Sequence, residues 1–199
     1  ERWSQVNPSW PDKAVNLYGP GKDSGTFDYF NKAINGDAEN SRTDYTASEN
    51  DDVIVKGVAA DPLALGYFGF EYYQANKAKL RALALEQPDG TKVFPTLKAV
   101  QDESYRPLSR PLFIYVNDKQ LQSSPSLREF VGYSLSNGYK LADEAGAIPL
   151  ISSTYRLIES KVYRRALGSA YAGSLPVGLT LKDILNRSLD QDKRPEFRN

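Results

Sequence analysis

Apolar residues recur at helical spacing near the start of the chain. Three of them lie three and four positions apart: Phe27, Phe30 and Ile34. This spacing predicts a helix that begins at Ser24 or Gly25 and turns one face to a core. Gly36 follows the last apolar position and is a typical end for a helix. The short apolar run at Ala14–Tyr18, bounded by turn residues, predicts a strand just before the helix.

The alternation of strands and helices continues to about residue 85. A capping pattern at Ser48–Asp51 predicts a second helix, which Asp61-Pro62 ends. Its predicted buried face consists of Val53, Ile54 and Val58. The next predicted elements are a buried strand at Ala64–Phe70, a helix at Glu71–Lys77 and a strand at Leu80–Leu85.

The second half of the chain has a different pattern. A turn signal at Pro88–Gly90 precedes Leu112–Val116, whose sequence Leu-Phe-Ile-Tyr-Val predicts the strongest strand of the chain. Beyond Asn117 the pattern is helical. The apolar positions of three predicted helices are Leu127, Phe130, Val131 and Leu135, then Tyr155, Ile158 and Val162, then Leu181, Ile184, Leu185 and Leu189. Strands alternating with helices, followed by helices, indicate an α/β protein with a lobe boundary near Arg110.

Composition narrows the possible functions. The 199 residues carry 25 Lys and Arg against 25 Asp and Glu, and they include no His, Cys or Met. This excludes a histidine base, a Ser-His-Asp triad, a thiol nucleophile and histidine or cysteine metal ligands. The balanced charge argues against a nucleic-acid partner, and no apolar run approaches the roughly 20 residues of a membrane span. Because residue 1 is not Met, we expect a processed chain or a piece of a longer protein.

One segment has the residues of an anion site. After the predicted strand, Ser24, Gly25 and Thr26 stand at the start of the predicted helix, where backbone N–H groups lack internal partners and the helix dipole is positive. Glycine lets an anion approach, and the two hydroxyls add donors, so the turn can form an oxyanion pocket. The alternative, which is more common, is that Asp23 or Ser24 merely caps the helix. The nucleotide P-loop pattern fails, because Asp23 follows Gly21-Lys22 where Ser or Thr is required.

Such a turn needs further donors to bind tightly. A helix terminus contributes about 0.3–1 kcal/mol, whereas micromolar affinity needs about 8 kcal/mol. Arg42 is the natural supplier, because its guanidinium can hold two oxygens at once, and Asp44 could orient it. The alternative is an ordinary exposed arginine in the polar loop at Asp37–Tyr45.

Several segments, taken in order, resemble a known family. They are Gly-x-Asp-Ser-Gly-Thr-Phe-Asp-Tyr-Phe at Gly21–Phe30, Ser41–Glu49, Gly57–Ala59, Ala64–Phe70 and Arg106–Val116. This series looks like that of the PstS/SphX-type phosphate-binding proteins of ABC transporters, over most of the chain from Glu1 to about Arg165. The resemblance implies a periplasmic-binding-protein-like fold, in which two lobes close like a hinge over one phosphate.

The resemblance also implies site residues and domains. Ser24, Gly25 and Thr26 match the phosphate-contacting turn, and Asp23 and Asp44 are further expected phosphate-binding residues. Pro20 stands where many relatives have their phosphate-gripping arginine, so Arg42 resembles its substitute. Residues 1–110 match the second lobe, and residues 111–199 match the return segment and C-terminal helices of the first lobe. The N-terminal part, with the aspartate that accepts the phosphate proton, is not in this sequence.

The implied function is binding of inorganic phosphate outside the cytoplasmic membrane and its delivery to the membrane permease of an ABC transporter. We expect a periplasmic or extracellular protein associated with the cell envelope, monomeric, without cofactor, metal or catalytic residue, and in need of the absent N-terminal half. Two alternatives stay open. One is a phosphatase-like or glycosidase-like enzyme that relies on Asp23, Asp28 or Asp44, with a metal for phosphoryl chemistry. The other is a structural fragment that cannot bind phosphate.

Overall fold

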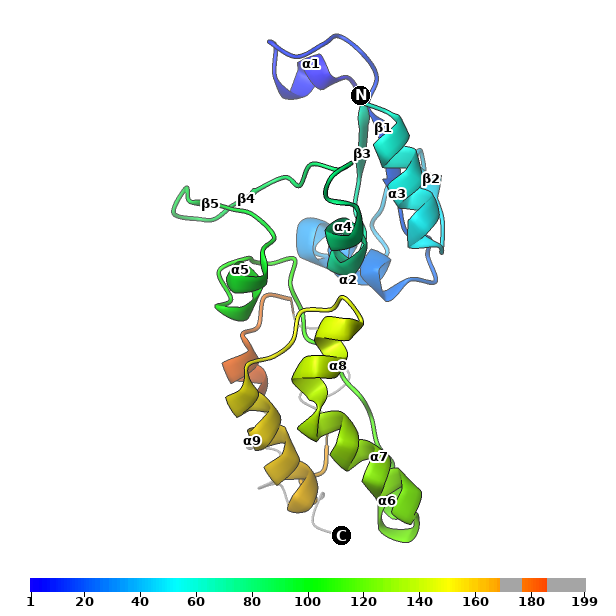
Figure 1. The fold of residues 1–199 in the computed structure, drawn as a ribbon. Helices are drawn as coiled ribbons and strands as arrows, with labels where there is room; N and C mark the ends of the chain where they lie inside the picture. The colour runs from blue at the N-terminus through cyan, green and yellow to red at the C-terminus, as the bar shows by residue number, and fades with distance from the viewer. Residues whose placement is uncertain (169–176, 186–199) are drawn as a thin grey trace. The chain divides into compact units, whose positions relative to one another are not determined.

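The structure is a computed structural model of the chain and describes residues 1–168 and 177–185. It consists of two compact units, unit 1 (Glu1–Ala84) and unit 2 (Leu85–Asn199), which are considered separately (Figure 1). Both helices and strands occur, which confirms the α/β class. The lobe boundary near Arg110 concerns the complete two-lobed fold and stays a prediction. Within the described residues, no helix has the length and apolar character needed to cross a membrane.

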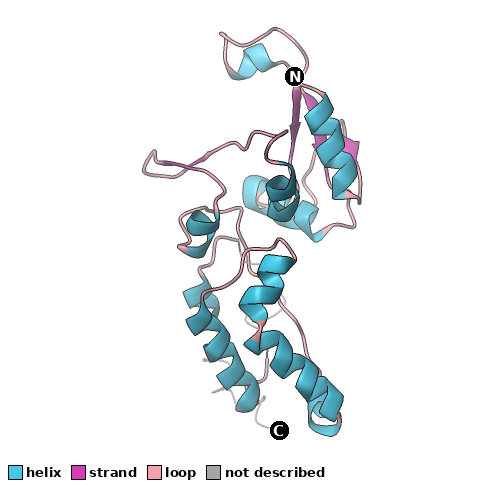
Figure 2. Ribbon diagram, in the orientation of Figure 1, coloured by secondary structure: helices cyan, strands magenta, loops and turns pink. Residues whose placement is uncertain are grey.

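Unit 1 is a small parallel sheet with helices that follow its strands (Figure 2). The central strand β1 (Asn16–Gly19) pairs with β2 (Thr46–Ala47) on one side and β3 (Ala64–Gly66) on the other. The helices are α1 (Trp3–Val6), α2 (Gly25–Asn35), α3 (Asp51–Ala60) and α4 (Phe70–Asn76). Because all three strands are parallel, their carboxyl ends lie at one edge, and α2, α3 and α4 each begin beyond that edge.

The ends of α2 and α3 follow their sequence signals. Gly36 ends α2 in the left-handed region at φ 78°, a conformation that glycine adopts without strain. Asn50 caps α3 by accepting a hydrogen bond from the Asp52 N–H, and Asp61 ends that helix as predicted. Both predicted helices are thereby confirmed.

The core of unit 1 contains apolar residues of α2 and α3, and α3 packs against β1, β3 and α4. The largest fully buried side chain of this core, Ile54, is 1% exposed. The other buried apolar residues of these helices are Phe27, Tyr29 and Val55. The predicted inward faces were wrong at Ile34 and Val53, which are 54% and 48% exposed. The helical spacing fits two adjacent faces of each helix, and in α3 Val55 rather than Val53 is buried together with Ile54.

Two of the predicted strands are shorter than expected. Only Ala64–Gly66 of the apolar run 64–70 pairs in the sheet, and α4 already begins at Phe70. The predicted strand at Leu80–Leu85 was wrong except at its end, where β4 (Leu85–Glu86) starts unit 2. Leu83 is well exposed, so this apolar stretch has no sheet to join among the described residues.

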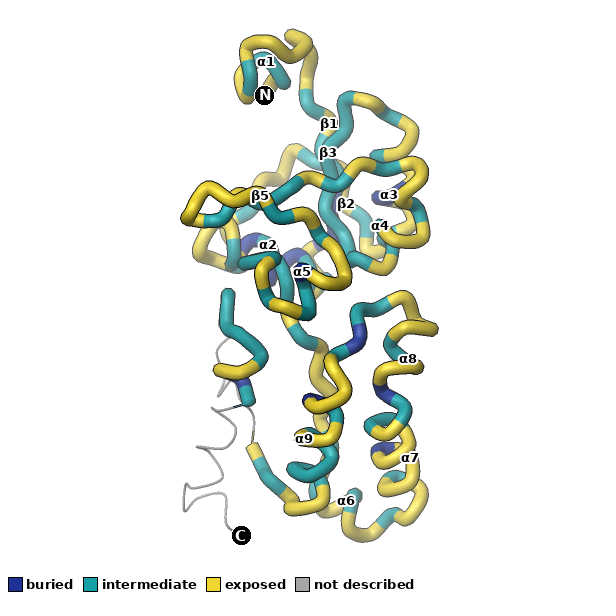
Figure 3. The backbone as a smooth tube through the Cα atoms, turned by 60° about the vertical axis from the view of Figure 1, so that its left-hand side comes forward, coloured by how far each residue is buried: buried dark blue, intermediate teal, exposed yellow. Residues whose placement is uncertain are grey.

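Among its described residues, unit 2 contains more helix than strand. A two-stranded antiparallel hairpin of β4 and β5 (Lys92–Val93) turns at Gly90, whose φ of +81° confirms the predicted turn. The helices that follow are α5 (Leu97–Gln101), α6 (Asp118–Ser123), α7 (Pro125–Ser136), α8 (Gly138–Glu144) and α9 (Ser152–Tyr163). Helices α7, α8 and α9 each bury a single residue, and α6 buries none. Figure 3 accordingly shows few buried positions along them.

The strand predicted at Leu112–Val116 was wrong. This segment forms no strand pair with the described residues, and Leu112 and Ile114 are 81% and 76% exposed. A strand needs a neighbour for its backbone hydrogen bonds, and high strand propensity cannot replace one. Leu112 and Ile114 are therefore exposed apolar side chains rather than residues of a buried strand.

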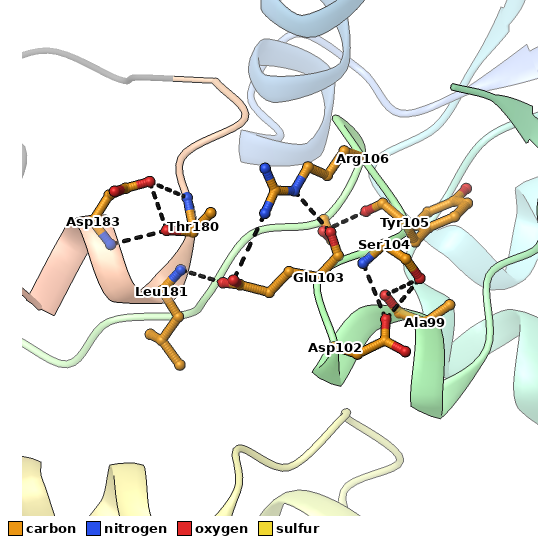
Figure 4. A network of polar contacts seen from close by, with 10 residues as sticks. Ala99, Asp102, Glu103, Ser104, Tyr105, Arg106, Thr180, Leu181 and Asp183 are labelled. Atoms are coloured by element: carbon orange, nitrogen blue, oxygen red, sulfur yellow. Dashed lines mark hydrogen bonds and ion pairs between the residues drawn. The ribbon is translucent and has the colours of Figure 1, made fainter. Parts of the chain in front are cut away.

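Residues 181–185 form a further helical turn, as predicted, while the predicted Leu189 lies outside the described residues. Thr180 and Asp183 exchange hydrogen bonds at its start (Figure 4). The Glu103 carboxylate accepts a hydrogen bond from the Leu181 N–H and pairs with Arg106 at 3.7 Å. This polar network joins the turn to the segment that follows α5, within unit 2.

Candidate functional site

The turn between β1 and α2 carries the three predicted donors. Ser24 is the N-cap of α2, and its Oγ accepts a hydrogen bond from the Thr26 N–H at 3.2 Å. The Ser24 N–H donates to the Gly21 carbonyl, also at 3.2 Å. The predicted cap is therefore present, and two of the three backbone donors already have partners.

The Gly25 N–H differs from the N–H groups of Ser24 and Thr26, which have hydrogen-bond partners. Among the described residues, no acceptor is found for it, as expected for the first residue of a helix. The Ser24 hydroxyl also keeps its own hydrogen to donate, because accepting from Thr26 uses only a lone pair. The turn can therefore cap the helix and still donate hydrogen bonds to an oxyanion.

The turn stands at the carboxyl edge of the parallel sheet. Ligands of open α/β sheets bind at this edge, where the strands end and the following helices begin. Here α2 starts after β1, α3 after β2 and α4 after β3. The N-terminal ends of three helices therefore share the edge that carries the turn.

Glu49, a residue of the predicted capping pattern at Ser48–Asp51, contacts the turn. Its Oε1 accepts a hydrogen bond from the Asp23 N–H at 3.4 Å. A Cβ at Gly21 would lie 1.8 Å from the same oxygen, so the absence of a side chain at Gly21 makes room for this carboxylate. Asp23 thus meets Glu49 through its backbone, while its own side chain is exposed.

Further carboxylates make this edge acidic. Burial raises the pKa of Asp51, and the negative charges of Glu71, Asp52 and Glu49 raise it further. Such charges oppose an additional anion unless protons or cations compensate. Binding of an oxyanion here therefore needs neutral donors or positive groups close to the turn.

Aromatic side chains line the base of the turn. The Tyr45 hydroxyl donates to the Pro20 carbonyl at 2.9 Å. The Tyr67 ring stacks on Phe30 of α2 with centroids 3.9 Å apart and an interplanar angle of 12°. Burial raises the pKa of both tyrosines, and that of Tyr67 reaches about 12. Both therefore stay neutral hydrogen-bond donors at neutral pH.

Arg42 is held by carboxylates. Its Nε and Nη2 donate to the two oxygens of Asp44 at 2.9 and 2.6 Å, and its Nη1 lies 2.9 Å from Glu1 Oε1. The hydrogen bonds to Asp44 and Glu1 raise the pKa of Arg42. The hydrogen bonds that Asp44 accepts from Arg42 lower the pKa of Asp44. Asp44 thus orients the guanidinium as predicted. Within the described part of the chain, no contact joins Arg42 to the turn.

A hollow of about 390 Å³ lies beside β1, lined by residues 15–18 and 43–46. Asp44 belongs to it, but none of Ser24, Gly25 and Thr26 does. The structure therefore does not gather all six predicted site residues into one pocket. The turn and the pair of Arg42 and Asp44 are separate features of unit 1.

Comparison with known proteins places the chain in a family. A sequence model of the PBP superfamily domain matches residues 1–138. The chain belongs to the PBP superfamily. This confirms the predicted periplasmic-binding-protein-like fold, of which the chain covers a part.

Similar proteins include two that are named for phosphate binding. Protein SphX of Synechocystis is 44% identical over 186 residues, which is 94% of this chain and 55% of that protein. The phosphate-binding protein PstS of Staphylococcus aureus is 39% identical over 77% of this chain and 46% of its own length. A crystal structure of a possible phosphate binding protein from Planctomyces limnophilus matches with a TM-score of 0.68 and 39% identity, over 82% of this chain and 58% of that one. The chain thus spans about half the length of these PBP relatives, and the resemblance to the PstS/SphX type is confirmed.

Proposed function

We propose that this chain carries the phosphate-contacting turn of a solute-binding protein. That protein would capture inorganic phosphate outside the cytoplasmic membrane, in the periplasm or extracellular space, and deliver it to the membrane permease of an ABC transporter. The proposal is supported by PstS of Staphylococcus aureus and the Planctomyces limnophilus protein, both named for phosphate binding, which align over 77% and 82% of the chain. The observation that carries it in the structure is the open Gly25 N–H at the start of the 11-residue helix α2, at the carboxyl edge of the sheet.

The proposed contacts use backbone and hydroxyl donors. One phosphate oxygen accepts from the Gly25 N–H, and the Ser24 and Thr26 hydroxyls donate to others. The positive end of the α2 dipole adds about 0.3–1 kcal/mol. Each charge-assisted hydrogen bond adds about 1.5–3 kcal/mol, so two or three of them approach micromolar affinity.

Arg42 is proposed to contact the phosphate as well. Asp44 holds its guanidinium from one side, and the proposal is that Arg42 exchanges Glu1 for a phosphate oxygen when the two lobes close. Both Glu1 and Arg42 are well exposed, so this ion pair is weak and the exchange costs little. Asp23 takes part through its backbone N–H, which donates a hydrogen bond to Glu49 at the edge of the same turn.

The rest of the pocket would come from outside this chain. We propose that residues 1–110 belong to one lobe and that residues 111–199 return to the other, whose N-terminal part packs against exposed apolar side chains of unit 2. The exposed apolar residues Leu112 and Ile114 and the sparsely buried helices α6–α9 support this arrangement. The assembled protein would act as a monomer that binds its ligand by hinge closure and catalyses no reaction.

Isothermal titration with inorganic phosphate, sulfate and a phosphate monoester tests the proposal. We expect heat with phosphate and no turnover of the ester. Turnover of the ester would instead indicate a carboxylate- or metal-dependent phosphatase. If none of the three ligands gave heat, either with the chain alone or with the missing half supplied, phosphate binding would be contradicted.

A substitution at the turn makes the test specific. Gly25→Val places a branched side chain where the phosphate would approach the backbone, and we expect phosphate binding to be lost while the fold is kept. Circular dichroism checks the fold. Equal affinity in this variant would contradict a close approach of phosphate to Gly25.

A further inference from the structure

Tyr67 lies between the end of the sheet and the helix that carries the turn. It follows β3 directly, and its N–H donates to the Tyr18 carbonyl of β1 at 3.4 Å. Its ring reaches across to α2 and stacks on Phe30, with centroids 3.9 Å apart. The ring is therefore fixed from both sides, by β1 and by α2.

The phenol end of the ring lies over the last residue of β1. A Cβ at Gly19 would lie 2.7 Å from Cε1 and 3.3 Å from Cζ, the atom that carries the hydroxyl. Gly19 directly precedes Pro20 and Gly21, which open the turn. The ring carbon that carries the hydroxyl thus lies near Gly19, at the carboxyl edge of the sheet, where the turn toward Ser24 and Gly25 begins.

The hydroxyls of the two neighbouring tyrosines differ in their partners. Tyr45 donates to the Pro20 carbonyl, so its hydroxyl has a structural hydrogen bond. In residues 1–168 and 177–185, the Tyr67 hydroxyl has no hydrogen-bond partner. A phenol donor in a half-buried site without a protein acceptor is available for a ligand.

We propose that the Tyr67 hydroxyl donates a hydrogen bond to the oxyanion bound at the Ser24–Thr26 turn. This inference rests on the proposed function and adds to it a ligand-binding residue. A neutral donor suits this edge, because Glu49 and Asp51 already make it acidic. With a pKa raised by burial, the phenol keeps its proton and does not add a repelling charge.

Tyr67→Phe tests the inference, because it removes the hydroxyl and keeps the stack on Phe30. The matched control is Tyr18→Phe, which removes a phenol hydroxyl from β1, where the ring packs against Gly57 of α3. In titrations with inorganic phosphate we expect Tyr67→Phe to raise Kd about tenfold or more, the loss of one charge-assisted hydrogen bond, and Tyr18→Phe to leave Kd unchanged. The melting temperature without phosphate should be equal in both variants, which separates a ligand contact from a structural role.

Each result decides between the two proposals. An unchanged Kd for Tyr67→Phe, with tight binding by the unsubstituted chain, overturns the inference and leaves the proposed function standing. No binding by the unsubstituted chain, even with the missing half supplied, contradicts the proposed function and the inference with it. If Tyr67→Phe does not fold, tyrosine ¹³Cζ resonances of the unsubstituted chain replace it. The Tyr67 signal should then shift on saturation with phosphate, and a stationary signal overturns the inference.

Discussion

At the start of α2, a single hydroxyl serves two purposes. The Ser24 Oγ accepts from the Thr26 N–H and caps the helix, while its hydrogen stays available to a ligand. Helix stability and anion binding can therefore be separated by choosing the substitution. Aspartate caps a helix as well as serine, but it brings a negative charge to the place proposed for phosphate.

We expect Ser24→Asp to keep the free energy of unfolding within about 0.5 kcal/mol, since the two caps are equivalent and the helix dipole favours the carboxylate. Phosphate affinity should fall at least tenfold, because like charges repel. Chemical denaturation and calorimetric titration measure the two quantities.

Ser24→Ala is the complementary variant. It should lower the free energy of unfolding by about 1 kcal/mol through loss of the cap. It should also weaken phosphate binding, because a donor is lost. Unchanged phosphate affinity in Ser24→Asp would show that the turn is a helix cap and nothing more.

The pair of Arg42 and Asp44 gives a prediction about pH. The hydrogen bond from Arg42 holds the pKa of Asp44 below its ordinary value. A carboxyl group whose pKa is lowered by folding stabilises the protein above its unfolded pKa, and this contribution is lost as the pH falls through the folded pKa. We expect Arg42→Ala to raise the pKa of Asp44 toward the ordinary value, measured by ¹³C carboxyl titration in acid. An Asp44 titration curve identical in both proteins would contradict the ion pair.

The sequence predicted part of the site and missed the rest for a physical reason. Ser24, Gly25 and Thr26 could be found because a helix start has a local signature. The contacts of Glu49 with Asp23 and of Tyr67 with Gly19 join residues far apart in the chain, and no local pattern reports them.

At the scale of elements, two glycines of unit 2 provide a matched test of packing. A Cβ at Gly138, at the start of α8, would lie 2.2 Å from the Tyr155 ring of α9. A Cβ at Gly132, inside α7, would meet nothing within 4 Å among the described residues. The same substitution should therefore act in opposite directions at the two positions.

We expect Gly138→Ala to lower the free energy of unfolding by about 1–3 kcal/mol, because α8 and α9 must separate or Tyr155 must turn. Gly132→Ala should raise it by up to about 1 kcal/mol, because alanine favours a helix interior. Urea denaturation of both variants measures the difference. Equal effects at the two positions would contradict the close contact of α8 with α9.

Elements with local signals were predicted well, and those that need distant partners were not. The helices of unit 1 were found from apolar spacing together with Asn50 and Gly36 at their ends. The strand at Leu112–Val116 was wrong, because pairing depends on a neighbouring strand that the described residues do not provide. The strand propensity of this segment shows that it can form a strand when a partner is present, not that it forms one here.

At the scale of the whole molecule, the exposed side chain of Ile114 gives a prediction about assembly. Ile114 is 76% exposed, so Ile114→Lys should change the stability of this chain by less than about 0.5 kcal/mol. If the missing half supplies a sheet edge, the lysine should prevent its docking. Size-exclusion chromatography with light scattering, on mixtures with the part of Synechocystis SphX that this chain does not cover, measures complex formation.

The matched control for assembly is Lys140→Glu, a charge change on an exposed position of α8. We expect complex formation with the unsubstituted chain and with Lys140→Glu, and none with Ile114→Lys. Equal complex formation by all three proteins would contradict a docking role for residues 112–116.

The amide resonance of Gly25 provides the most direct measurement. In a ¹⁵N-labelled sample titrated with inorganic phosphate, the Gly25 N–H signal should move strongly and saturate at the same concentration as the calorimetric heat. An unmoved Gly25 amide in a protein that has bound phosphate would place the ligand elsewhere and contradict the account.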